Sequence, residues 1–173
     1  MAKKYDIIFF IFLISLAFFA CPKKVTPPPP QEIEAPSITE QKIEEEEPSI
    51  RGDEFVSIAE IKNVYFEFDK YDLTDEAKKI LQKNAEYLIA NPQYEVLVEG
   101  HTCECGSNEY NLGLGQKRAN TVREYYINLG VEAGRIATIS YGEEKPINPN
   151  AGPPDSPLCK SNRRAETKVR IKK

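Results

Sequence analysis

The residues with the most specific chemistry are one histidine and three cysteines: His101, Cys103, Cys105 and Cys159. One imidazole and three thiolates are enough for a tetrahedral zinc site. Two of the thiols, however, form a Cys-x-Cys pair, which is tighter than the usual zinc spacing of about two to four intervening residues. We therefore expect no metal, and the thiols become candidates for a disulfide if the protein is exported.

The N-terminus predicts export. It has a positive start at Lys3, an almost unbroken apolar run at 7–19, and the small residue Ala20 just before Cys21. The run is too short for a membrane-spanning helix, which needs about 20 apolar residues. A small residue and then cysteine at its end resembles a bacterial lipobox. This resemblance implies that residues 1–20 are a cleaved signal and that Cys21 carries a lipid.

Residues 21–60 are predicted to be the lipidated cysteine and a disordered tether. The composition changes at Pro22 to a proline run at 27–30 and a glutamate run at 44–47, which cannot bury enough surface to offset chain entropy. Extended, such a segment reaches at most on the order of 120 Å. Because Pro22 is not the aspartate of some inner-membrane retention signals, the outer membrane is favoured, with the chain facing the periplasm.

Residues 61–173 form the remaining part, which is long enough for one globular domain. The chain has a net charge of −4 and a single histidine. Binding nucleic acid needs a clustered basic face, which an acidic chain of this kind lacks. Nucleic acid is therefore excluded as a partner.

Hydrophobic periodicity places six elements in this domain. Val64, Phe66 and Phe68 alternate with polar neighbours, as in a half-buried strand. Thr74 is a candidate helix cap, followed by an apolar face with a 3.6-residue period that runs to Ile89. The expected elements are strands at 64–69, 94–100, 135–141 and 166–171 and helices at 75–90 and 112–129, with a loop before the last strand.

The order strand, helix, strand, helix, strand, loop, strand defines the fold class. Strands separated by helices need crossover connections, and the last strand has one polar face. We predict an α+β two-layer sandwich, in which a mixed four-stranded sheet carries helices on one face.

Four segments in register carry a family resemblance. They are Val-Tyr-Phe-Glu-Phe-Asp-Lys-Tyr-Asp at 64–72, Val-Glu-Gly-His-Thr at 98–102, Glu-Tyr-Asn-Leu at 109–112 leading to Arg-Ala at 118–119, and Ser-Tyr-Gly-Glu-Glu-Lys-Pro at 140–146 followed by Asn-Arg-Arg at 162–164. Together they resemble the OmpA-like domain of the peptidoglycan-associated lipoproteins of the Tol-Pal system. The resemblance implies binding to peptidoglycan and to periplasmic Tol proteins, with no cofactor.

The resemblance also implies a pocket for diaminopimelate, a stem-peptide residue whose side chain ends in an ammonium and a carboxylate. Arg118 matches the family's carboxylate-binding arginine, and a guanidinium fork suits that role. Phe68 and Asp69 match pocket positions after the first strand, and Leu114 matches an apolar wall residue. The resemblance places Asn162 and Arg163 beside the site, and for them we favour a structural role over ligand contact.

The chain departs from the family in one loop. The family pattern Gly-His-x-Asp-Glu-Arg-Gly becomes Gly-His-Thr-Cys-Glu-Cys-Gly at 100–106, so that cysteines replace the Asp expected to hold the ligand ammonium and the Arg. Thr102 and Glu104 of this loop are expected ligand contacts, with Glu104 as a substitute anion. In the family, the segment after Cys159 packs near this loop, which implies a disulfide from Cys159 to either Cys103 or Cys105, and we favour Cys105. Such a bond would close a loop of about 54 residues and stabilise by roughly 4 kcal/mol.

Two other classes of function remain open. The domain could be a periplasmic protein-binding module that has altered or lost its peptidoglycan binding, or a metal-binding variant that uses the Cys and His residues. An enzyme is not expected, because no nucleophile, base and orienting acid fall together in the matched segments.

Overall fold

The structure is a computed structural model that describes residues 48–50 and 54–172. The predicted signal, Cys21 and most of the predicted tether lie outside the described residues. Within the described part, no helix is long and apolar enough to cross a membrane.

The described elements follow the predicted order, with short additions. They are β1 (Val64–Tyr65), α1 (Asp75–Ala90), β2 (Tyr94–His101), α2 (Asn108–Asn128), a 3-10 turn (Ala133–Arg135), β3 (Ile136–Gly142), α3 (Pro157–Asn162) and β4 (Arg164–Ile171).

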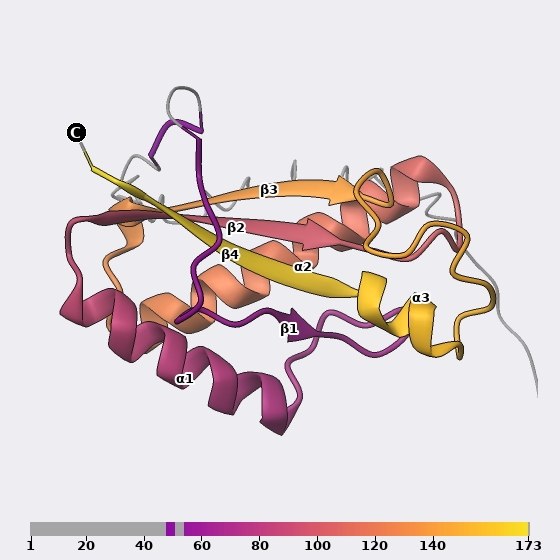
Figure 1. The fold of residues 1–173 in the computed structure, drawn as a ribbon, viewed down its shortest axis with the longest axis horizontal. Coiled ribbons are helices and arrows are strands. Elements are labelled where there is room, and N and C mark those ends of the chain that lie inside the picture. The colour runs from indigo at the N-terminus through magenta and orange to yellow at the C-terminus, as the bar shows by residue number, and fades with distance from the viewer. Residues whose placement is uncertain (1–47, 51–53, 173) are drawn as a thin grey trace, which may run out of the picture. The chain divides into compact units, whose positions relative to one another are not determined.

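The four strands form one mixed sheet in the order β1-β4-β2-β3. β2 pairs with β3 in parallel and with β4 antiparallel, and β4 pairs antiparallel with β1. β2, β3 and β1 all point toward the end of the sheet where α3 lies (Figure 1). The predicted α+β fold class with a mixed four-stranded sheet is confirmed.

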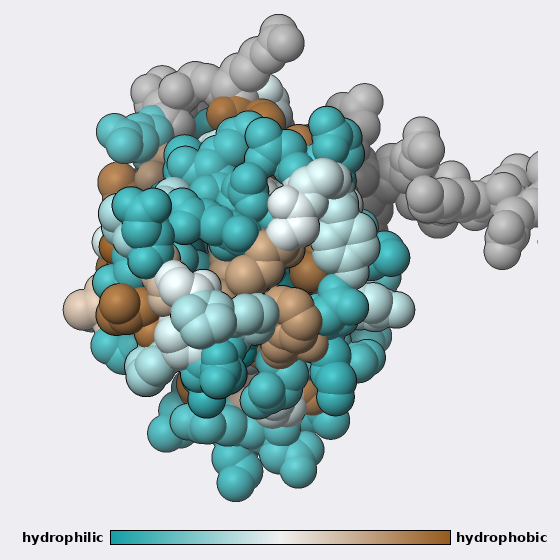
Figure 2. All heavy atoms as spheres, turned by 90° about the vertical axis from the view of Figure 1, so that its right-hand side faces the viewer, coloured by the Kyte–Doolittle hydropathy of each residue, from teal (hydrophilic) through white to brown (hydrophobic). Residues whose placement is uncertain are grey.

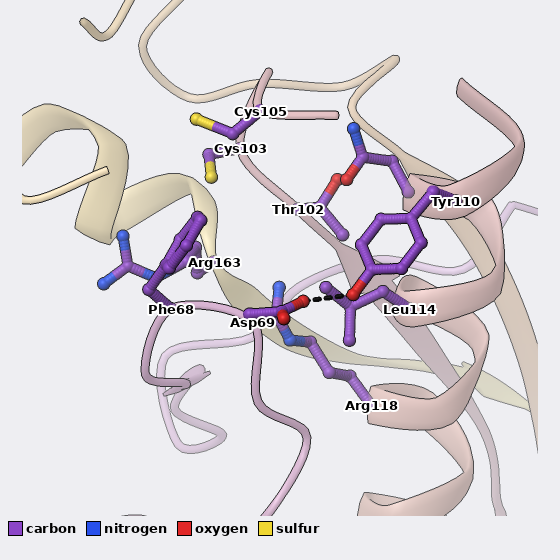
Figure 3. A pocket seen from close by; sticks show the side chains of 10 residues that line it. Phe68, Asp69, Thr102, Cys103, Cys105, Tyr110, Leu114, Arg118 and Arg163 are labelled. Atoms are coloured by element: carbon purple, nitrogen blue, oxygen red, sulfur yellow. Dashed lines mark hydrogen bonds between the residues drawn. The ribbon is translucent and has the colours of Figure 1, made fainter. Parts of the chain in front are cut away.

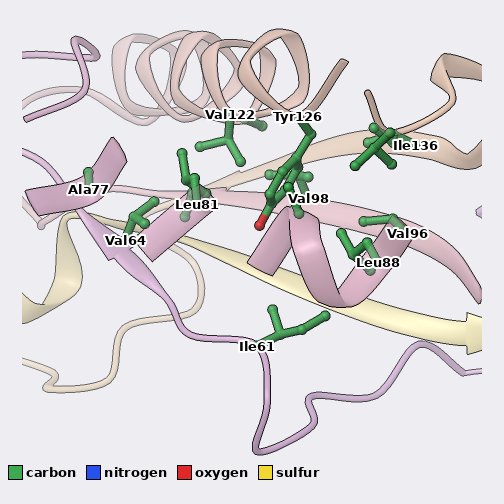
Figure 4. Close-up of a cluster of buried hydrophobic side chains, with 14 of the residues drawn as sticks. Ile61, Val64, Ala77, Leu81, Leu88, Val96, Val98, Val122, Tyr126 and Ile136 are labelled. Carbon is green, nitrogen blue, oxygen red and sulfur yellow. The ribbon is translucent and has the colours of Figure 1, made fainter. Parts of the chain in front are cut away.

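The main core lies between the sheet and the two long helices (Figure 4). This cluster includes Val96 and Val98 of β2, Leu81 and Leu88 of α1 and Val122 of α2, and all five side chains are buried. Both helices therefore pack on the same face of the sheet, as predicted.

The opposite face of the sheet carries a second, smaller apolar cluster. It contains Leu97, Ala137 and Phe55. Val56 also forms a β-bridge to Val169, with N···O distances of 2.9 and 3.0 Å. Phe55 and Val56, which belong to the predicted tether, thus contact the folded domain.

α1 begins as its sequence predicts. The Thr74 side chain accepts a hydrogen bond of 3.1 Å from the Ala77 amide, which satisfies one of the free N–H groups of the first turn. The apolar face ends earlier than expected, because Ile89 is 47% exposed. Asn84 is buried instead, and its amide bonds the Lys62 carbonyl and the Tyr126 hydroxyl.

The largest differences from the sequence predictions concern β1, α2 and α3. β1 leaves the ladder after Tyr65, because the following residues turn into the loop described below. α2 begins four residues earlier than expected, at Asn108, since the Ser107 side chain caps it by accepting from the Tyr110 amide. The segment predicted as a loop contains α3, whose cap is Ser156 and whose first residue is Pro157, a pairing that favours helix initiation.

A close contact between two glycines fixes where α2 crosses β2. A Cβ at Gly100 would overlap the Gly115 carbonyl, and a Cβ at Gly115 would overlap the Ser140 hydroxyl. Only glycine allows the helix to lie this close to the end of the strand. The first half of α2 is thereby held beside the residues that follow β2.

Candidate functional site

A small pocket lies at the end of the sheet, where the loops after β1 and β2 meet the start of α2 and the end of α3 (Figure 3). Its volume is about 180 Å³, which suits one amino-acid side chain better than a drug-sized ligand. The lining residues are Phe68, Asp69, Thr102, Cys103, Cys105, Tyr110, Asn111, Leu114, Arg118 and Arg163.

The structure brings together five of the six residues expected to contact a ligand. Phe68, Asp69, Thr102, Leu114 and Arg118 all line the pocket. Glu104 is exposed and is not among the lining residues. Its Oε2 accepts a hydrogen bond of 2.9 Å from the Asn150 amide, so this carboxylate holds the loop that follows β3.

Arg118 is the most buried charged group of the pocket, with 0% exposure. Its guanidinium donates to the carbonyls of Lys70 (2.9 Å), His101 (2.8 Å) and Glu67 (3.3 Å). These bonds join the loop after β1 to the end of β2. A guanidinium has five N–H donors, so three bonds leave two donors for a ligand. Burial lowers the pKa of Arg118 to about 10, and the side chain remains a cation at neutral pH.

Asp69 supplies a carboxylate to the same pocket. It has a φ of 58°, a left-handed conformation that is uncommon for residues other than glycine and often marks functional loops. The Tyr110 hydroxyl donates a hydrogen bond to its Oδ1 (Figure 3). This bond raises the pKa of Tyr110, so the phenol stays protonated and orients the carboxylate.

Thr102 contributes a buried hydroxyl without a partner. Its side chain is 2% exposed, and Oγ1 has no hydrogen-bond partner among the described residues. A buried polar atom left unpaired is costly. Because Thr102 lines the pocket, a ligand donor placed there would satisfy it.

The three domain cysteines lie close together, and Cys103 and Cys105 line the pocket. Their sulfur atoms all lie within 4.8 Å of one another, and all three are free thiols. Burial raises the pKa of each thiol. Cys103 is therefore neutral at neutral pH and does not replace the charge of the family's aspartate.

His101 does not belong to the sulfur cluster. Its ring stacks on Tyr141 with centroids 5.7 Å apart, and its Nε2 lies 3.5 Å from Glu99 Oε2. Burial lowers the pKa of His101. The four-ligand zinc set considered from the sequence is thus divided between two places, with the cysteines in one and the histidine in the other.

Sequence reasoning missed some of the pocket's residues. In the sequence Tyr110 stands only as part of a motif, although its position three residues after the helix cap lets it reach across to Asp69. Arg163 was expected to be structural, and it does bond the Phe66 and Pro154 carbonyls. It also lines the pocket. Asn162 is structural, since its Oδ1 accepts from two amides of the loop after β3.

A model of the OmpA family matches residues 65–157, just over half of the chain. The chain belongs to the OmpA family. The matched segment contains the second residue of β1, the strands β2 and β3, both long helices and every lining residue of the pocket except Arg163. The part of the chain that builds the site is therefore the OmpA-family domain.

Known relatives of this OmpA-family domain are named for peptidoglycan. The chain is 57% identical over 83 residues to the peptidoglycan-associated lipoprotein of Haemophilus influenzae, covering 48% of this chain and 54% of the relative. It is 41% identical over 104 residues to that of Agrobacterium fabrum, covering 60% and 57%. The chain thus spans little more than half the length of these curated relatives.

Solved structures agree with the fold. The crystal structure of the peptidoglycan-associated lipoprotein from Burkholderia pseudomallei matches with 42% identity and a TM-score of 0.58, over 62% of this chain and 89% of that one. The C-terminal domain of Helicobacter pylori MotB matches with 22% identity and a TM-score of 0.56, over 65% and 86%. At 22% identity, the match to MotB shows a similar fold and nothing more.

Proposed function

We propose that this protein is an outer-membrane lipoprotein that binds the diaminopimelate residue of peptidoglycan stem peptides without a covalent bond. The observation that carries the proposal is a fixed cation and a fixed anion in one small pocket, Arg118 and Asp69. A side chain that ends in both an ammonium and a carboxylate needs one of each. The names of the relatives support peptidoglycan as the source of such a ligand.

The proposal gives a role to each group that lines the pocket. The two remaining N–H groups of Arg118 donate to the ligand carboxylate, in charge-assisted hydrogen bonds that are stronger than neutral ones. Asp69 and the unpaired hydroxyl of Thr102 accept from the ligand ammonium. Phe68 and Leu114 contact the methylene chain that joins these two charged groups to the peptide backbone.

The proposed role of Asp69 compensates for the replacement of the family's aspartate by Cys103 in the loop after β2. Cys103 stands where the family carries an aspartate and is a neutral thiol, so it offers the ammonium no charge. Asp69 is already held toward the pocket by Tyr110 and can supply the charge. The proposed ligand is therefore still a zwitterion, although one anion of the family's pocket has been lost.

The proposed role in the cell combines a lipid anchor at Cys21 with the folded domain. We propose that a lipid on Cys21 anchors the protein to the outer membrane, that residues 21–60 act as the tether, and that residues 61–173 hold the cell wall. Periplasmic Tol proteins are the proposed protein partners. We propose that the protein acts as a binding module and not as an enzyme, since burial raises the pKa values of the thiols at the pocket.

Competition between two stem peptides tests this function. Full-length protein in detergent is captured on purified peptidoglycan and released with tetrapeptides containing either meso-diaminopimelate or lysine at position three. Lysine lacks the side-chain carboxylate, so Arg118 loses its partner, and we expect lysine peptide to compete at least about tenfold less well. Equal competition, or no capture on peptidoglycan, would refute the proposed ligand and favour a protein-binding module.

The sulfur cluster gives a second prediction. Because all three sulfurs lie within 4.8 Å and the periplasm is oxidising, we propose one disulfide in the exported protein, between Cys105 and Cys159. Intact mass after thiol labelling should show one labelled cysteine in this domain before reduction and three after it. Mapping by proteolysis should place the single label on Cys103. Three labelled thiols before reduction, or a stoichiometric metal, would contradict the disulfide.

A further inference from the structure

A second groove adjoins the pocket and shares part of its wall. It has a volume of about 300 Å³ and is lined by Tyr71, Glu109, Gly113 and Lys117, together with residues that also line the pocket. Asp69, Tyr110 and Leu114 belong to both. A ligand held in the pocket can therefore continue into the groove without leaving the protein surface.

Gly113 forms an open floor in this groove. It lies inside α2, and a Cβ built there would meet no atom within 4 Å. Glycine destabilises the interior of a helix relative to alanine, and Gly100 and Gly115 show what a packing reason looks like in this protein. No close packing contact of this kind requires glycine at position 113. The lack of a side chain there instead keeps the groove above the helix open.

Lys117 supplies the groove with a cation. It is exposed one helical turn after Gly113, and among the described residues it is in no ion pair. Its ammonium lies 5.5 Å from the centre of the Tyr71 ring, a contact that holds the side chain over the groove. Figure 2 views the domain from the end where the pocket lies, and apolar and polar side chains are mixed on that face.

We propose that the groove is a second subsite, which binds the part of the stem peptide next to the diamino acid. The peptide backbone passes over Gly113, and a free carboxylate of the neighbouring residue pairs with Lys117. Tyr71 and Tyr110, which are 43% and 52% exposed, contact the peptide on either side. This inference rests on the proposed function, because it extends the same ligand beyond the pocket.

Two variants test the subsite, with two ligands. Gly113→Leu fills the groove, and Lys117→Gln removes its cation. Binding of free meso-diaminopimelate and of the tetrapeptide that contains it is measured on full-length protein in detergent. We expect Gly113→Leu to weaken the peptide about tenfold or more and Lys117→Gln to weaken it about two- to fivefold, as for an exposed ion pair. Both should bind the free diamino acid as the parent does.

Glu124→Leu is the matched control, because it places the same side chain on an exposed position of α2 outside the groove. It should leave both affinities unchanged. Gly113→Leu should melt at or above the parent's temperature, since leucine favours helix over glycine, so weaker binding would not reflect unfolding. If both variants bind the peptide as the parent does, the subsite is wrong while the pocket stands. If the parent binds neither ligand, the proposed function fails and the subsite fails with it.

Discussion

Arg118→Ala is expected to weaken stem-peptide binding at least thirtyfold and to lower the free energy of unfolding by on the order of 3 kcal/mol. Both effects have the same origin. The guanidinium holds three backbone carbonyls of two segments, and its removal leaves them without their donor. The loop that carries Asp69 is then released, and the cation of the pocket is gone.

A second buried arginine separates the two effects. Arg135 is 6% exposed and also donates to three carbonyls, those of Tyr94, Leu88 and Asn91. It does not line the pocket. Arg135→Ala should therefore destabilise the domain to a similar degree, while the folded protein keeps the parent's affinity.

The measurement pairs calorimetry on the diaminopimelate tetrapeptide with urea unfolding of each variant. Arg118→Lys should recover little of the binding, because one ammonium on a flexible stem cannot hold three carbonyls and a carboxylate together. The proposed role of Arg118 would be excluded if a folded Arg118→Ala protein bound the peptide as tightly as the Arg135→Ala protein does.

The elements of the fold could be predicted because each one has a local signal. Thr74 caps α1 in the structure as its sequence position indicates, and the alternation from Val96 onward fits a strand with one face in the core. The missed helix α3 has only six residues. A helix of this length has no hydrophobic period that could be detected, although Ser156 and Pro157 were a capping signal.

The arrangement of the pocket could be predicted only in part. Motif matches placed Arg118 in the site, but an arginine on a helix gives no local sign that it will be fully buried. Its burial arises because the loop after β1 folds over it and the end of β2 lies beneath it. The same holds for Cys159, which lies far from Cys103 in sequence and reaches it only through the packing of α3.

Changing Cys21 to serine should move the protein from the outer membrane to the soluble periplasmic fraction. Under the proposed function, residues 1–20 are removed together with the apolar run at 7–19, and the lipid on Cys21 holds the mature chain. Stable attachment then depends on the lipid, which anchors firmly when it carries two or more acyl chains. Serine cannot form the thioether, so the anchor is lost while the domain is unchanged.

Cys103→Ser is the matched control, since it also removes one thiol but leaves Cys21 in place. It should remain in the outer-membrane fraction through salt and carbonate washing, whereas Cys21→Ser should be released before any wash. Intact mass should show a lipid on the control protein and none on Cys21→Ser. A Cys21→Ser protein that stayed in the membrane after carbonate washing would show that something other than a lipid on Cys21 holds it there. Attachment through Cys21 would then be wrong, even if the pocket bound peptidoglycan as proposed.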